Sequence, residues 1–191
     1  MRITVERSID PARIDQFYGF YRAAFEPLRT RAAARHTLRR DEFAEEMRDE
    51  RVDKYVAWDG DTAVGLTTIT NDLESVPWIE PAFYLARHPE QAARGGIFYL
   101  GYILVDPAPG ARTFRAFREM AYALLQHVAD RRGVLAYDVS GYNSGRQVGR
   151  MITDLLRTFG TGAEPADTQV FYTAEFGAQR ADREPSPPPI S

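Results

Sequence analysis

The stretch IFYLGYILVDPAPGARTFRAF, residues 97–117, predicts a strand, a sharp bend and the start of a helix. Its first ten residues are almost continuously apolar, which is typical of a strand buried on both faces. A proline- and glycine-containing elbow follows, and apolar residues then recur at helical spacing from Phe114 onward. A helix that starts directly after a strand presents unpaired backbone N–H groups at the bend, and such groups can hold an anion.

Further elements are predicted on both sides of this junction. Asp10-Pro11 is a typical helix start, because aspartate caps the first turn and proline suits its first position. Asp59-Gly60-Asp61 separates two β-rich runs and predicts a hairpin. The remaining predicted elements are a strand at 2–9, a helix at 41–50, a short helix near 81–87, a strand at 134–140, a helix at about 144–159 and a closing strand at 168–176.

The order of these elements predicts an α/β fold in which helices cover a mixed sheet. Residues 97–140 form a strand–helix–strand unit, which makes its two strands parallel neighbours. We expect one domain over residues 1–177 and a disordered, proline-rich tail over residues 178–191.

Composition narrows the classes of function. The formal net charge of −3 favours binding neither to nucleic acid nor to an anionic membrane. The chain has no cysteine, and its three histidines are widely separated, so no metal site is expected. MRITVERSID lacks the apolar core of a secretory signal, and no apolar run approaches the ~20 residues that span a bilayer. A soluble, cytoplasmic protein is therefore the expectation.

The chain resembles the GNAT N-acetyltransferase superfamily over about residues 2–176. The resemblance lies in the order of the elements, in the strand ending Val105-Asp106-Pro107 before the elbow, and in Asn143 after the next strand. The resemblance implies a mostly antiparallel central sheet flanked by helices, with splayed fourth and fifth strands. It also implies acetyl-CoA or another acyl-CoA as co-substrate, with the pantetheine arm lying between the splayed strands.

In that family a loop patterned Arg/Gln-x-x-Gly-x-Gly/Ala holds the CoA pyrophosphate, and aligned without a gap it begins at Gly110. The resemblance therefore implies CoA-binding residues on the strand, the elbow and the following helix: Ile103, Leu104, Val105, Gly110, Ala111, Arg112, Thr113, Phe114, Arg115 and Asn143. The usual glycines are absent, and Arg112 or Arg115 can contact phosphate in their place. The alternative is that Thr113 caps the helix and both arginines are solvated.

Acyl transfer from a thioester to an amine needs a base for the amine proton, donors for the oxyanion and, in some enzymes, an acid for the thiolate. Candidate bases are Glu80, between bulky apolar residues, and Asp138, at the end of a predicted strand. Either carboxylate can instead belong to an ordinary loop or turn. The helix at 144–159 lacks the tyrosine that often serves as the acid in the family, so Tyr142 or Tyr102 would have to replace it, with its hydroxyl turned toward the cleft.

Two features bear on the acceptor. Trp78, Phe83 and Tyr84 can wall an acceptor pocket or simply anchor a long loop. The arginine-rich stretch 29–40 can attract an acidic acceptor or form a salt-bridged surface.

The sequence thus supports an acyl-CoA-dependent N-acyltransferase acting on a small-molecule or peptide amine by direct attack on the thioester. Two alternatives stay open: a non-catalytic ligand-binding or regulatory module, and an acyltransferase whose donor is a carrier protein. A homodimer is a further expectation, because the last strand of such sheets is often an interface.

Overall fold

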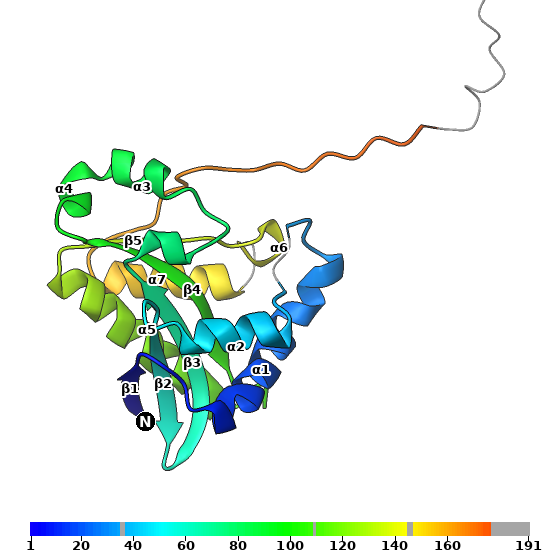
Figure 1. Cartoon of the computed structure of the whole chain (residues 1–191), viewed down its shortest axis with the longest axis vertical. Coiled ribbons are helices and arrows are strands. Elements are labelled where there is room, and N and C mark those ends of the chain that lie inside the picture. Colours follow the sequence, from blue (N-terminus) through cyan, green and yellow to red (C-terminus); the bar gives the residue numbers. More distant parts are fainter. Residues whose placement is uncertain (35–36, 109, 145–146, 177–191) are drawn as a thin grey trace, which may run out of the picture.

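The computed structural model describes residues 1–34, 37–108, 110–144 and 147–176. Five strands form one sheet: β1 (Arg2–Glu6), β2 (Asp53–Asp59), β3 (Thr62–Thr70), β4 (Ile97–Val105) and β5 (Val134–Tyr137). Their spatial order is β1-β2-β3-β4-β5, with antiparallel pairs except for the parallel pair β4–β5 (Figure 1). The mixed, mostly antiparallel sheet predicted from the sequence is confirmed.

The helices lie on both faces of this sheet. They are α1 (Pro11–Phe25), α2 (Arg40–Arg48), α3 (Pro81–Arg87), α4 (Pro89–Ala92), α5 (Ala111–Asp130), α6 (Gly141–Ser144) and α7 (Gln147–Thr158), with 3-10 turns η1 (Glu26–Thr30) and η2 (Leu73–Ser75). The Asp10 side chain accepts a hydrogen bond from Ala12 N at 2.9 Å, so the predicted start of α1 is confirmed.

Two apolar cores fix which face each helix covers. On one face, Phe17 of α1 and Phe43 of α2 pack with Leu66 and Tyr102 of the sheet. On the other face, Leu124 of α5 packs against the opposite sides of β2, β3 and β4. This two-sided burial explains why β4 reads as a nearly continuous apolar run.

The pairing of β4 with β5 is short. It runs from Ile97↔Val134 to Leu100↔Tyr137, whereas β4 continues to Val105. The predicted strand at 134–140 therefore ends at Tyr137, and the two neighbours separate beyond that point. This is the divergence of the fourth and fifth strands that the resemblance implied.

The predicted strand at 168–176 is wrong. These residues have no secondary structure and are exposed, and Figure 1 shows the segment running away from the sheet. Val170 and Tyr172 are 60% and 88% exposed, so neither side chain is buried in a core. The tail predicted at 178–191 lies outside the described residues, and within the described part no helix is long and apolar enough to cross a membrane.

Candidate active site

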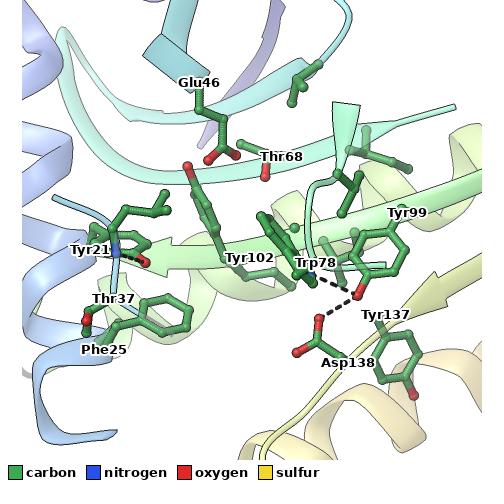
Figure 2. Close-up of a pocket in the computed structure, with 18 of the residues that line it drawn as sticks. Tyr21, Phe25, Thr37, Glu46, Thr68, Trp78, Tyr99, Tyr102, Tyr137 and Asp138 are labelled. Carbon is green, nitrogen blue, oxygen red and sulfur yellow. Dashed lines mark hydrogen bonds between the residues drawn. The ribbon is translucent and has the colours of Figure 1, made fainter. Parts of the chain in front are cut away.

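A cavity of about 920 Å³ opens where β4 and β5 separate. One wall is the edge of β4 around Ile103 and Val105, and a second is the chain that follows β5, including Asp138 and Asn143. The third is one face of α2 together with the segment at Trp78. Figure 2 shows aromatic and acidic side chains converging on this space.

An irregularity in β4 shapes the floor of the cavity. Leu100 and Ile103 both face α5, although a regular strand would place them on opposite faces. The register against β3 also changes between Thr67 and Ile69. The extra residue lies at Gly101–Tyr102 and turns Tyr102 toward α1 and α2, as in a β-bulge.

One polar cluster lies beside the end of β5. The Tyr99 hydroxyl donates a hydrogen bond to Asp138 Oδ1 at 2.5 Å, and Trp78 Nε1 donates to the Tyr99 oxygen at 3.3 Å (Figure 2). Burial, and secondarily the bond to Asp138, raises the pKa of Tyr99 far above its ordinary value. Tyr99 therefore stays protonated and holds Asp138 at the mouth of the gap between β4 and β5.

A second cluster centres on Glu46, which projects from α2 toward Tyr102 and Thr68 (Figure 2). Burial raises the pKa of the Glu46 carboxyl to about 7, while the Tyr102 hydroxyl and the charge of Lys54 oppose the rise. Burial likewise lowers the pKa of Lys54 to about 8. The sequence did not single out Glu46, because Asp41, Glu42, Glu45 and Glu46 form an acidic run that is typical of a solvated helix face.

The elbow after β4 is held by its own side chains. Gly110 precedes α5 with a φ of +148°, a conformation that L side chains rarely adopt. Arg112 pairs with Asp106 at 3.0 Å and lies 3.7 Å from Asp59. The Thr113 hydroxyl donates to Ala108 O at 2.6 Å. Arg112 is thus occupied by two carboxylates.

The other predicted donor-side residues lie in three different settings. Ile103, Val105 and Asn143 line the cavity, whereas Leu104 is fully buried in the core beneath α1 and α2. Ala111 and Phe114 open α5 with exposed side chains. Arg115 is exposed too, and it makes no ion pair or hydrogen bond within the part of the chain that the structure describes.

The predicted catalytic residues are only partly brought together. Asp138 lines the cavity, but Glu80 does not. The Glu80 side chain is exposed and accepts a hydrogen bond from Ala82 N at 3.2 Å, which caps α3. The apolar neighbours of Glu80 in the sequence therefore do not bury it. The Tyr142 hydroxyl accepts a hydrogen bond from Arg31 at 2.9 Å and is not part of the cavity lining.

The three predicted acceptor-pocket aromatics also differ. Trp78 lines the cavity and is 49% exposed. Tyr84 packs on Tyr99 at a ring distance of 6.1 Å, and Phe83 packs on Tyr84 at 5.2 Å. Phe83 and Tyr84 thus anchor α3 outside the cavity lining.

The described arginines of the stretch 29–40 face solvent rather than the cavity. Their partners are Glu26 for Arg29, Tyr142 for Arg31, Glu42 for Arg39 and Asp15 for Arg40. Of the two alternatives, the structure supports the surface network, and among the described residues no Lys, Arg or His lines the cavity to meet an acidic acceptor.

No family model matches the chain, and no curated protein sequence matches it. Solved structures do match. One, a possible acetyltransferase from Clostridium difficile 630, superposes with a TM-score of 0.53 at 11% identity, covering 92% of this chain and 100% of the other. Another, a probable acetyltransferase, gives a TM-score of 0.52 at 11% identity over 93% and 100%.

At 11% identity, the likeness to these two structures concerns the fold alone. Element order and the separation of β4 from β5 agree with that likeness. The chain therefore has the fold of the GNAT acetyltransferases.

Proposed function

We propose that the chain is an acyl-CoA-dependent N-acyltransferase that transfers acetyl, or a related acyl group, to an amine. The observation that carries the proposal is the cavity along the part of β4 that β5 leaves unpaired. Strand backbone without a partner offers N–H and C=O groups to an extended, amide-containing ligand. The pantetheine arm of CoA is such a ligand, and the description of both similar structures as acetyltransferases supports the same conclusion.

In the proposed reaction the amine nitrogen forms a bond to the thioester carbon, and the carbon–sulfur bond breaks to release the thiolate. Asp138, oriented by Tyr99, accepts the proton that the nitrogen loses. Backbone N–H groups at the bulge of β4 are candidates to stabilise the oxyanion. The step needs no nucleophile from the protein, so the absence of cysteine is compatible with it.

On the donor side, we propose that Ile103, Val105 and Asn143 border the pantetheine arm and that the start of α5 faces the phosphates. Arg112 is held by Asp106 and Asp59, whereas Arg115 is available to an anion. Because α5 has 20 residues, its N-terminus also carries the partial positive charge that favours phosphate.

Binding and turnover test the proposal separately. Acetyl-CoA at millimolar concentration should raise the melting temperature, because a ligand that binds only the folded state stabilises it. Release of CoA thiol should require an added amine, and Asp138→Asn should slow it by about a hundredfold or more. Asp61→Asn, in the exposed turn after β2, removes the same charge outside the cavity lining and should leave the rate unchanged.

The outcomes distinguish the alternatives. No stabilisation by any acyl-CoA contradicts the proposal. Stabilisation without thiol release from a broad amine panel indicates a non-catalytic binding module. Thiol release that Asp138→Asn leaves intact keeps the acyltransferase but removes Asp138 from the chemistry.

A further inference from the structure

One face of α2 supplies the acidic wall of the cavity. Four carboxylates with the spacing of a single helix face line it: Glu42, Glu45, Glu46 and Asp49. Arg39 pairs with Glu42 at 3.1 Å, and Arg51 pairs with Asp49 at 2.6 Å. The outer two charges are therefore neutralised by the protein itself.

In the described part of the chain, the two inner carboxylates, Glu45 and Glu46, have no such ion pair. Within the described ranges no basic side chain lies within ion-pair distance of either carboxylate, and no Lys, Arg or His lines the cavity. Lys54 influences Glu46 but does not line the cavity, and its ammonium group donates to the backbone carbonyls of Arg7 and Asp49 at 2.8 and 2.5 Å. The field in this part of the cavity favours a cation.

Polar groups beside Glu46 give an independent sign of a ligand. Thr68 is 1% exposed and Tyr102 is 7% exposed, and both line the cavity. The Thr68 hydroxyl oxygen has no hydrogen-bond partner among the described residues, whereas the neighbour of the Tyr102 hydroxyl is the Glu46 carboxyl. Buried hydroxyl groups are normally hydrogen-bonded, and each of these can accept from a donor entering the cavity.

Aromatic rings complete the surroundings. Tyr102 packs against Tyr21 and Phe25 with ring distances of 5.4 and 6.2 Å, and all three line the cavity (Figure 2). The faces of aromatic rings attract ammonium groups. They also pack against the methylene chain that links two ammonium groups. Carboxylates, hydroxyl acceptors and rings are together the chemistry that recognises an alkylammonium group.

We infer that the Glu45–Glu46 wall, with Thr68 and Tyr102, binds a second ammonium group of the acceptor, so that the preferred acceptors are diamines or polyamines. This inference rests on the proposed function for the reacting nitrogen, which it places at Asp138. The second nitrogen is not acylated at this wall: it anchors the acceptor. Acceptors that carry carboxylates or phosphates are disfavoured in the same space.

The test is equilibrium binding without any acyl-CoA. Straight-chain α,ω-diamines of three to eight carbons are titrated calorimetrically into the full chain at low ionic strength, each against the monoamine of the same length. The best diamine should bind about tenfold more tightly than its monoamine, as one added charge-assisted hydrogen bond allows. Glu45→Gln should reduce this advantage and Glu46→Gln should abolish it, while both variants keep a cooperative thermal transition.

Glu50→Gln is the matched control, because Glu50 is exposed just beyond α2 and does not line the cavity. This variant should keep the advantage. Equal binding of every diamine and its monoamine, binding of neither, or an advantage that Glu46→Gln leaves intact overturns the inference. Diamine binding without CoA thiol release contradicts only the proposed function, whereas equally fast release from monoamines and diamines contradicts only this inference.

Discussion

At position 101, β4 passes so close to Thr68 that a Cβ atom there would lie 2.5 Å from the Thr68 hydroxyl oxygen. The same atom would lie 3.8 Å from a carboxylate oxygen of Glu46. Glycine at this residue therefore allows the bulge of β4, Thr68 and Glu46 to meet at the floor of the cavity. A larger residue must push one of these groups away.

We predict that Gly101→Ala lowers the free energy of unfolding by about 1–3 kcal/mol, the usual cost of overpacking. Thr68→Ala in the same chain should recover most of the loss, because the next neighbour, Thr68 Cβ, would lie at an ordinary 3.7 Å. Denaturant unfolding of the two single variants and the double variant measures this coupling. A double variant as unstable as the sum of the single variants argues against the contact.

At the scale of elements, the helix α5 presents two arginines in its first turns with different surroundings. Arg112 is paired with Asp106 and Asp59, and Arg115 is unpaired within the described residues. We predict that Arg115→Ala weakens the binding of CoA several-fold and lowers its dependence on salt, because a direct phosphate contact is lost. Arg118→Ala, one turn further on and paired with Glu119 at 3.2 Å, should have little effect in the same titration.

The segment 168–176 gives a second test at this scale. Its β-branched and aromatic residues predict a core strand, but the structure leaves Phe171 and Tyr172 exposed by 53% and 88%. The double change Phe171→Ser and Tyr172→Ser should therefore alter the free energy of unfolding by no more than about 0.5 kcal/mol. Loss of about 3 kcal/mol or more in denaturant unfolding would place these rings in a core instead.

For the molecule as a whole, the stability should depend on pH through the buried pair Glu46 and Lys54. The folded-state pKa of Glu46 is raised from 4.5 to about 7, so the folded chain keeps a proton that the unfolded chain has lost between these values. The free energy of unfolding therefore falls as pH rises through this range. Lys54, with its pKa lowered from 10.5 to about 8, makes stability rise again as pH increases from about 8 to 10.5.

Taken together, these two groups make stability lowest between about pH 7 and 8. Glu46→Gln removes the contribution of Glu46 to this pH dependence. The decrease in the free energy of unfolding between about pH 5 and 7.5 should therefore be smaller than in the parent chain, by up to about 3 kcal/mol. Urea unfolding at the two pH values measures the difference. An unchanged pH dependence in the variant would show that Glu46 titrates normally.

The sequence by itself determined the elements that depend on neighbouring residues. The strand at 97–105, the elbow and the helix that follows are readable because apolar spacing, proline and glycine act locally. The place of Asp138 in the cavity lining was also predictable, because a strand that ends beside a parallel neighbour delivers the next side chain to the sheet edge.

Tertiary structure alone decided which of the remaining candidates meet. Glu80 and Glu46 are both carboxylates on or beside a helix, yet only Glu46 faces the cavity, because the packing of α2 on the sheet sets its direction. The β-branched and aromatic residues of 168–176 suit a strand, but a strand also needs a partner, and the described sheet does not include this segment. Local sequence patterns determine the conformation of a residue and the face of its helix or strand on which it lies. Contacts between distant segments determine which groups that face packs against.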